Sequence, residues 1–288
     1  MSELTEKIES YVRENHCPIF TLALLGDGIE ENITFVKTNR CQDSYSIAKA
    51  YTVTAFGLAF DRGLIRPEDR VAELLGKYMK PDTDPRWQTI TYDDVMLHKL
   101  GLPSGFLDID VAPAGKFGYD YLGYLFAEPF VAEPRVERCY TDAAYYLLSR
   151  AVEEVTGEPI DNLLWREIFV KQRYAEAAWS HCPQGHPMGA TGLYVRSKDM
   201  VKLGELYRRG GVWNGERLLS EEWVNIVISR GYELRPAGIG DAYAKGGMYG
   251  QDLCVFPEKR LSVAWHAYGF KDKQPLRELI YFAADTAK

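Results

Sequence analysis

A serine and a lysine stand three residues apart in the segment DSYSIAKAY, at Ser46 and Lys49. A serine hydroxyl is a weak nucleophile at neutral pH and needs a positioned base before it can attack a carbonyl carbon. Residues at positions i and i+3 share one face of a helix, so Lys49 can lie next to Ser46. The same spacing also fits a capping hydroxyl followed by a surface lysine, and the pair alone does not decide between these interpretations.

Two later segments carry residue types that suit the same chemistry. They are Tyr140-Thr141-Asp142 and Lys245-Gly246-Gly247. With the Ser46/Lys49 pair, they resemble the Ser-x-x-Lys, Tyr-x-Asn and Lys-Ser/Thr-Gly motifs of the penicillin-recognising serine hydrolases. Flanking segments such as ITYDDVMLHKLGLPSG and RCYTDAAYYLLSRAVEEVTGEPI are also similar to this family. The resemblance covers nearly the whole chain and is strongest to class C β-lactamases, D-aminopeptidases, D-Ala-D-Ala carboxypeptidases and family VIII esterases.

The resemblance implies that Ser46 is the nucleophile and forms an acyl-enzyme that water later hydrolyses. Tyr140 and Lys49 would share the proton transfers. The backbone N–H groups of Ser46 and Met248 would form the oxyanion hole. The expected catalytic residues are Ser46, Lys49, Tyr140 and Lys245, and the expected substrate-binding residues are Asp142, Gly246, Gly247 and Met248.

The identity of the base stays open in the sequence. An isolated lysine is protonated at neutral pH and cannot accept a proton. Burial of Lys49 beside a second cation, which Lys245 could supply, would favour the neutral amine. The same two ammonium groups would also favour the phenolate of Tyr140, so either residue could serve.

Asp142 and Gly246 depart from the family motifs. Asp142 stands where relatives have asparagine, and an ionised carboxylate cannot donate a hydrogen bond to a substrate carbonyl. It could instead pair with Lys49 and keep that lysine protonated, or cap the helix that begins there. Gly246 lacks the hydroxyl that helps relatives to hold a substrate carboxylate, a loss of about 1.5–3 kcal/mol. We therefore expect neutral or cationic substrates.

These motifs predict a serine hydrolase that acts on ester or amide substrates, including D-amino-acid or β-lactam-like ones. It should be an esterase, peptidase or amidase more than an efficient β-lactamase. The alternative is a penicillin-binding fold that has lost turnover and serves as a ligand-binding or structural module. The presence of the serine, both lysines and the tyrosine favours the enzyme. A cell-wall transpeptidase would need an export signal, and the sequence shows none.

The elements that would position these residues come from both ends of the chain. Apolar patterning predicts strands near residues 18–26 and 31–38, a helix from Ser46 to Gly63, and a mostly helical middle. Strands and helices return after residue 190. We expect a helix capped by Ser197, a hairpin at Asn214-Gly215, a helix capped by Ser220, and a single strand over AKGGMYGQDLCVF. We therefore expect an α/β (α+β) fold of the β-lactamase/transpeptidase type, in which helices from both chain ends flank an antiparallel sheet. The expected domains are 1–63 with 190–288 for the sheet and 64–189 for the helical insertion, with the active site in the cleft between them.

Composition restricts the partners and the location. The formal net charge of −7 disfavours a nucleic acid or an anionic membrane, so we expect a small-molecule ester, amide or peptide substrate. The N-terminal segment MSELTEKIESYVREN is charged and amphipathic, which is not typical of a signal peptide. No apolar stretch approaches the roughly 20 residues that span a bilayer. With five scattered cysteines and no CxxC motif, these features favour a cytoplasmic protein.

No motif predicts a metal or a cofactor. His181, Cys182 and His186 lie close together in the sequence, but no HExxH motif or second cysteine accompanies them. The glycine patterns of P-loops and Rossmann folds are absent, as is the G-x-S-x-G turn of α/β-hydrolases.

Overall fold

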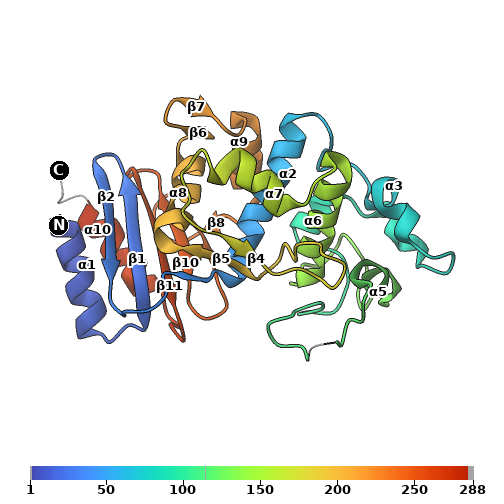
Figure 1. Ribbon diagram of the computed structural model, residues 1–288, viewed down its shortest axis with the longest axis horizontal. Coiled ribbons are helices and arrows are strands. Elements are labelled where there is room, and N and C mark those ends of the chain that lie inside the picture. The colour runs from blue at the N-terminus through green and yellow to red at the C-terminus, as the bar shows by residue number, and fades with distance from the viewer. Residues whose placement is uncertain (1, 114, 285–288) are drawn as a thin grey trace. The chain divides into compact units, whose positions relative to one another are not determined.

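The computed structural model describes residues 2–113 and 115–284, and the chain divides into two compact units (Figure 1). Unit 1 consists of Met1–Ile47, Ile168–Ala178 and Leu193–Lys288. Unit 2 consists of Ala48–Glu167 and Trp179–Gly192. This division groups the helix after Ser46 with unit 2, whereas the sequence-based boundary at residue 63 places it with the sheet.

Unit 1 is built on a six-stranded antiparallel sheet with the strand order β2-β1-β11-β10-β9-β8. The strands are β1 (Ile19–Gly26), β2 (Ile29–Thr34), β8 (Arg235–Pro236), β9 (Tyr243–Gly246), β10 (Asp252–Phe256) and β11 (Leu261–Ala267). All residues of β10 and β11 are buried, because helices cover both faces of the sheet. An antiparallel sheet flanked by helices from both chain ends is thereby confirmed.

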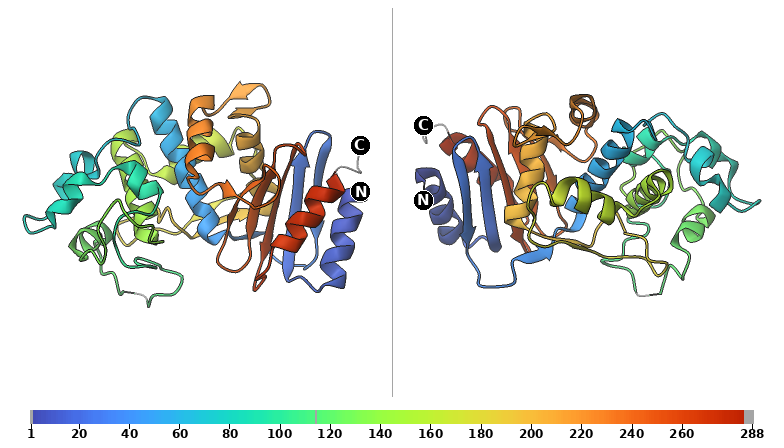
Figure 2. Two further views of the ribbon diagram at one scale, coloured as in Figure 1. Left: turned by 180° about the vertical axis from the view of Figure 1, so that it is seen from behind. Right: turned by 45° about the horizontal axis from the view of Figure 1, so that its top comes forward.

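Three helices cover this sheet. Helices α1 (Glu3–Glu14) and α10 (Gln274–Ala283) pack together on one face, and α8 (Ser197–Arg208) lies on the other (Figures 1 and 2). Leu4, Ile8 and Val12 of α1 are buried at helical spacing, and they join Ile280 of α10 in the apolar core against the strands. The sheet is therefore a fixed platform for the residues at its edges.

Shorter elements complete unit 1. Strand β3 (Cys41–Asp43) pairs with β5 (Leu193–Arg196), and the turn η1 (Tyr45–Ile47) follows β3. Strands β6 (Val212–Trp213) and β7 (Glu216–Arg217) form the predicted hairpin, with Asn214 at φ 48° and Gly215 at φ 84° in its turn. Helix α9 (Glu221–Arg230) begins at the predicted Ser220 cap.

Unit 2 is mostly helical and centres on α2 (Ala48–Asp61) and α6 (Asp142–Thr156). Helix α2 is apolar on all sides and buried from Ala48 to Ala59, so it forms the interior of this unit with α6 against it. The remaining elements are α3 (Val71–Leu75), η2 (Gly76–Tyr78), η3 (Pro85–Thr89), α4 (Tyr92–Met96), α5 (Tyr121–Ala127), α7 (Ile160–Leu164), the π-helical turn η4 (Trp165–Phe169) and β4 (Ala178–Trp179), the last two lying at the junctions with unit 1.

Three local predictions differ from the structure. Thr141, not Asp142, caps α6, and Asp142 is the first residue of that helix. Ser197 begins α8 without capping it, because its Oγ is hydrogen-bonded to Thr21 and His266 instead. The segment AKGGMYGQDLCVF contains two strands, β9 and β10, since a turn at 247–251 separates them.

Among the residues that the structure describes, no helix combines the length and the apolar character needed to cross a bilayer.

Candidate active site

Ser46 lies in the short turn η1 that leads directly into α2. The backbone before it is fixed: Ser44 donates from its N–H and its hydroxyl to the Leu193 carbonyl, at 2.9 and 2.7 Å. Tyr45 adopts a left-handed conformation at φ 48°, and its N–H donates to Asp43 Oδ1 at 2.7 Å. Ser46 is partly exposed at the N-terminal end of a long helix, where the helix dipole favours an anionic oxygen.

Lys49 is completely buried in unit 2. Its Nζ donates to Asp142 Oδ1 at 2.7 Å and to the Ala190 carbonyl at 2.9 Å. The same atom lies 4.8 Å from the ring centroid of Tyr140. The structure therefore brings together three residues that the sequence singled out, Lys49, Tyr140 and Asp142, and of the two roles left open for Asp142 it shows the pairing with Lys49.

The position of Tyr140 follows from the start of α6. Thr141 Oγ1 donates to the Phe106 carbonyl at 2.7 Å, and the Thr141 N–H donates to His98 Nδ1 at 3.3 Å. The buried His98 ring packs against the Tyr140 ring with 4.4 Å between centroids. The guanidinium of Arg138 lies 5.4 Å from the Tyr140 ring centroid. Tyr140 is thus held beside two cationic side chains.

The segment 189–192 supplies the carbonyl that Lys49 contacts. Gly189 has φ 68°, and a Cβ there would clash with the Tyr145 carbonyl, so only glycine fits. Thr52 Oγ1 donates to the Gly189 carbonyl at 2.7 Å and anchors the segment on α2. The close packing at Gly189 therefore fixes the direction of the Ala190 carbonyl.

Two further carboxylates, Asp108 and Asp110, lie beside Asp142. Ligand atoms of the three residues are all within 4.8 Å of one another, and Thr191 Oγ1 donates to Asp110 Oδ2 at 2.6 Å. Burial, followed by the Asp142 charge, raises the pKa of Asp108, and burial with its two acidic neighbours raises the pKa of Asp110. The Lys49 ammonium lowers both values in part. Three acidic groups thus surround one lysine.

Lys245 lies on β9 in unit 1, where its ammonium forms an ion pair with Glu233. Both side chains are buried, with 8% of Lys245 and 2% of Glu233 exposed. Glu233 adopts φ 64°, an unusual conformation for a residue other than glycine. Because this carboxylate compensates the Lys245 charge, the electrostatic support expected from Lys245 is weaker than that of a free ammonium.

The absence of a side chain at position 246 is explained by Lys273, which precedes α10. A Cβ on Gly246 would collide with the Lys273 ammonium, and that ammonium pairs with the buried Asp252 at 3.0 Å. Lys273 therefore occupies the space into which a side chain at position 246 would extend. The hydroxyl that relatives carry does not fit there unless Lys273 moves.

Gly247 lets the segment after β9 approach the turn before Ser46. A Cβ on Gly247 would lie 2.8 Å from the Ser44 carbonyl, closer than side chains tolerate. The Tyr45 and Tyr249 rings meet edge to face at 5.0 Å between centroids. This packing carries Met248, between Gly247 and Tyr249, to the neighbourhood of Ser46, as an oxyanion hole formed by their N–H groups would require.

The histidines near Cys182 have separate partners. His181 Nε2 lies 2.9 Å from Asp161, and His186 Nδ1 lies 2.8 Å from Glu153. Cys182 Sγ accepts a hydrogen bond from the Tyr146 hydroxyl at 3.3 Å. Each ring nitrogen in these pairs faces a carboxylate rather than a common centre.

Several groups at the site were not identified from the sequence. A backbone carbonyl such as that of Ala190 has no residue-type signal, although the two glycines of GATG mark a tight segment. Nothing in the patterns around the missed side chains distinguishes them from surface charges. The missed groups are the Ala190 carbonyl and the side chains of Asp108, Asp110, Glu233 and Lys273.

Comparisons with known proteins agree with the motif resemblance. The family model described as Beta-lactamase matches residues 34–288. Penicillin-binding protein 4 of Amycolatopsis lactamdurans is 27% identical over 178 residues, which cover 57% of this chain and 45% of that protein. Alignments with four curated relatives cover between 22% and 45% of those proteins' lengths.

Solved structures show the same fold. A putative β-lactamase from Bacteroides dorei has a TM-score of 0.79 at 14% identity, with 99% of this chain and 100% of that one covered. A family VIII carboxylesterase has a TM-score of 0.78 at 15% identity, with 99% and 96% covered. The predicted β-lactamase/transpeptidase-like fold is confirmed by these similarities.

Proposed function

The chain belongs to the β-lactamase family of serine hydrolases, and from this premise we propose that it cleaves neutral or cationic esters and amides through an acyl-enzyme on Ser46. The observation that carries the proposal is the environment of Lys49. Its buried ammonium donates to a carboxylate and to a carbonyl, three residues after Ser46. Burial of a charged group costs free energy, and perturbed buried charges are typical of functional sites.

Tyr140 is the base in this proposal. Lys49 donates to Asp142 and Ala190, so its ammonium form is stabilised and it is a poor proton acceptor. The same ammonium lies 4.8 Å from the centroid of the Tyr140 ring, so Tyr140 is the remaining candidate base beside it. Asp142, the departure from the family motif, thereby assigns the proton transfers to Tyr140 and leaves Lys49 as an electrostatic partner.

The reaction then proceeds in two halves. The Tyr140 oxygen accepts the Ser46 hydroxyl proton while Oγ bonds to the substrate carbonyl carbon, and the N–H groups of Ser46 and Met248 stabilise the oxyanion. When the tetrahedral intermediate collapses, Tyr140 returns the proton to the departing alcohol or amine. Water attacks the acyl-enzyme with Tyr140 again as base, and the proton finally restores the Ser46 hydroxyl.

An aromatic surface suggests the shape of the substrate. The Tyr249 ring contacts Tyr45 and also stacks on Tyr268 at 4.5 Å between centroids. Tyr268 is 56% exposed and Met248 is 44% exposed. Exposed aromatic and thioether groups next to the nucleophile suit an apolar or aromatic group on the substrate.

The charges argue against anionic substrates. Asp108, Asp110 and Asp142 surround the single Lys49 ammonium, and Lys245 is already paired with Glu233. A β-lactam or a D-Ala terminus carries a carboxylate, which the three aspartates would repel. Neutral and cationic acyl compounds avoid that repulsion.

The experiment is a substrate panel run on the wild type, Ser46→Ala and Tyr140→Phe. The panel contains p-nitrophenyl butyrate and phenylacetate, D-alanine p-nitroanilide, D-Ala-D-Ala and nitrocefin. We expect hydrolysis of the esters or the anilide, at least about a 10³-fold loss of kcat in Ser46→Ala, and a loss of about 10²–10⁴-fold in Tyr140→Phe. Efficient nitrocefin turnover with negligible ester hydrolysis would overturn the substrate class.

A fluorophosphonate probe separates catalysis from mere binding. Labelling of the wild type that vanishes in Ser46→Ala supports the serine hydrolase. Absence of labelling in a sample with native circular dichroism supports a protein that has kept the fold and lost turnover.

A further inference from the structure

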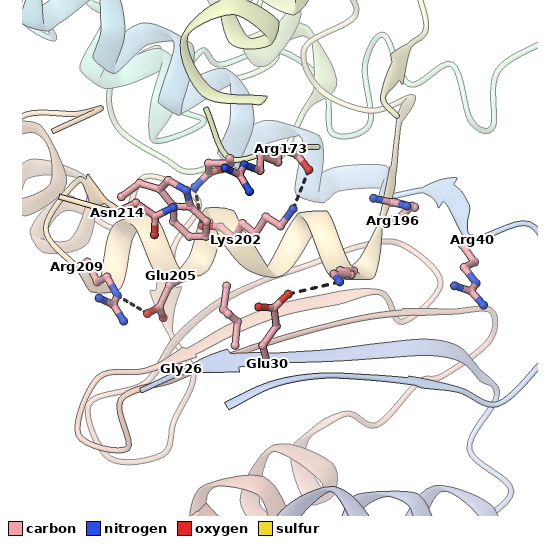
Figure 3. A pocket seen from close by; sticks show the side chains of 13 residues that line it. Gly26, Glu30, Arg40, Arg173, Arg196, Lys202, Glu205, Arg209 and Asn214 are labelled. Atoms are coloured by element: carbon pink, nitrogen blue, oxygen red, sulfur yellow. Dashed lines mark hydrogen bonds and ion pairs between the residues drawn. The ribbon is translucent and has the colours of Figure 1, made fainter. Parts of the chain in front are cut away.

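A cavity of about 570 Å³ lies along one side of α8, within unit 1 (Figure 3). Its size is that of a site for a small organic molecule. The residues that line it come from β1, β2, the segment before β3, the segment 168–178, the start and one face of α8, and the hairpin that follows. They are Leu25, Gly26, Glu30, Arg40, Gln172, Arg173, Arg196, Lys198, Lys202, Glu205, Arg209, Trp213 and Asn214.

The lining of this α8 cavity is cationic in an acidic protein. Six of the lining residues are arginine or lysine and two are glutamate, whereas the whole chain has a formal net charge of −7. The cations are Arg40, Arg173, Arg196, Lys198, Lys202 and Arg209. A concave surface that gathers one sign of charge concentrates ligands of the opposite sign.

Buried carboxylates orient part of this cationic lining. Asp199, whose side chain is fully buried, accepts from Arg196 Nε and from Lys202 Nζ, both at 2.7 Å. Lys202 Nζ also donates to the Arg173 carbonyl at 3.1 Å. One carboxylate thus holds two cations in place and neutralises only one of them. Arg196 and Lys202 are therefore preorganised for an anion, because neither side chain needs to be ordered on binding.

The surplus charge lies toward the N-terminal half of α8. Figure 3 shows Arg40 and Arg196 toward one end of the cavity, with Arg209 beside Glu205 toward the other. At that second end the charges balance, because Glu205 and Asp27 accept from Arg209.

Arg40 and Arg173 add unbalanced charge. Within residues 2–113 and 115–284, no ion pair involves either of these two side chains, and both residues are exposed. The dipole of the twelve-residue α8 adds further positive potential at this end.

Apolar side chains also line the cavity, and one of them is a large ring. Leu25 and the half-buried Trp213 line the cavity, and both also line a smaller adjoining pocket with Val201 and Leu24. Arginine guanidinium groups bind phosphate oxygens through paired N–H donors, and an indole stacks on planar rings. We propose that the α8 cavity binds a small organic molecule that carries phosphate and a planar ring, the chemistry of a nucleotide.

This site differs from the nucleotide sites that sequence motifs reveal. P-loops and Rossmann turns cradle phosphate with backbone N–H groups of glycine-rich loops, and this chain has none. In the α8 cavity the phosphate contacts come from side chains on separate segments. A glycine pattern is therefore not needed, and the inference is independent of the hydrolase reaction proposed above.

The test is isothermal titration calorimetry of the full chain with ADP, pyrophosphate and adenosine as probes. We expect ADP to bind most tightly, pyrophosphate more weakly, and adenosine least. The variant Arg40→Ala/Arg173→Ala should lower the affinity for ADP and for pyrophosphate at least about tenfold. Trp213→Ala should lower the affinity for ADP but not that for pyrophosphate. Trp213→Phe, which keeps a ring, should retain most of the ADP affinity.

The matched control is Lys37→Ala/Lys80→Ala, which removes two exposed cations that do not line the cavity. It should bind ADP within about twofold of the wild type. Circular dichroism verifies that each variant is folded, and unchanged ester hydrolysis shows that the effect is separate from the catalytic residues. Absence of ADP binding at millimolar concentration, or equal binding by Arg40→Ala/Arg173→Ala and the wild type, would overturn the site. Equal affinities for ADP and pyrophosphate would overturn its assignment to nucleotides.

Discussion

The charged groups near Lys49 in unit 2 are mostly acidic, whereas those along α8 in unit 1 are mostly basic. In unit 2, three carboxylates surround one fully buried ammonium. In unit 1, six cations line a cavity with two carboxylates, and two of those cations share the buried Asp199 beneath them. In both places a buried aspartate fixes a cation, but only at α8 does positive charge remain for a ligand. The chain therefore separates the groups that would repel an anion from those that would bind one.

The largest expected effect concerns the buried pair in unit 2. Asp142→Ala leaves the Lys49 ammonium buried without its carboxylate, so we expect the free energy of unfolding to fall by about 3–5 kcal/mol. Arg40→Ala at the α8 cavity removes an exposed side chain and should change it by less than about 0.5 kcal/mol. Urea unfolding measures both. Asp142→Asn keeps an oxygen that can accept from Lys49, so its loss in free energy of unfolding should lie between those of the other two variants.

Acid should weaken unit 1 through His266. Burial lowers the pKa of His266 to about 4, so the unfolded chain, with its ordinary value of 6.5, takes up the proton first. The stabilising contribution is complete above pH 6.5 and is lost as the pH falls toward 4. At pH 4.5 the wild type should lose about 2–3 kcal/mol more than His266→Gln, relative to pH 7.5. Equal pH profiles in urea unfolding would contradict this expectation.

Substrate charge provides a third measurement. With p-nitrophenyl hexanoates that end in an ammonium, a methyl or a carboxylate, kcat/KM should be higher for the ammonium ester than for the carboxylate ester by about tenfold, or about 1.4 kcal/mol. Asp108→Asn/Asp110→Asn should reduce this ratio, while Arg40→Ala/Arg173→Ala should leave it unchanged. A carboxylate ester hydrolysed as fast as the ammonium ester would show that the acidic residues do not influence the substrate.

The smallest effect is expected at Asp108 and has the opposite sign to that at His266. Burial and the Asp142 charge raise the pKa of Asp108, so its ionisation disfavours the folded state. Stability is therefore regained as the pH falls through the raised value. Asp108→Asn should raise Tm slightly at pH 7 and should lose this advantage in acid. Calorimetric scans of both proteins from pH 4 to 7 test the sign.

The fold was largely predictable, because its signals repeat along the chain. The helical spacing of Leu4, Ile8 and Val12 and the apolar strand segments near both chain ends each specify an element, and helices from both ends must cover the same sheet. The turn at 247–251 was missed, since a tight backbone reversal within an apolar run leaves the hydrophobic pattern unchanged. The prediction that Asp142 caps α6 was wrong, because the neighbouring Thr141 occupies the N-cap position. The Asp142 carboxylate is thereby left to pair with Lys49.

The candidate site was predictable only where side-chain types carry the information. The ordered motifs supplied Lys49, Tyr140 and Asp142, and the structure places these three together. The catalytic roles, including that of Ser46, stay predictions until the variants are measured. Ala190 and Glu233 could not have been found, because one acts through a backbone carbonyl and the other reaches Lys245 through an uncommon backbone conformation.

The contact between Gly246 and Lys273 couples the mutation of these two positions. Serine at position 246 would have to displace the Lys273 ammonium, which is the end of a flexible side chain. Loss of Lys273 alone is tolerable, because Arg277 still donates to both oxygens of Asp252, at 2.6 and 2.8 Å. In a laboratory evolution toward carboxylate-bearing substrates, we therefore expect replacement of Lys273 to accompany the hydroxyl at position 246. A library that varies positions 246 and 273 together would test this coupling.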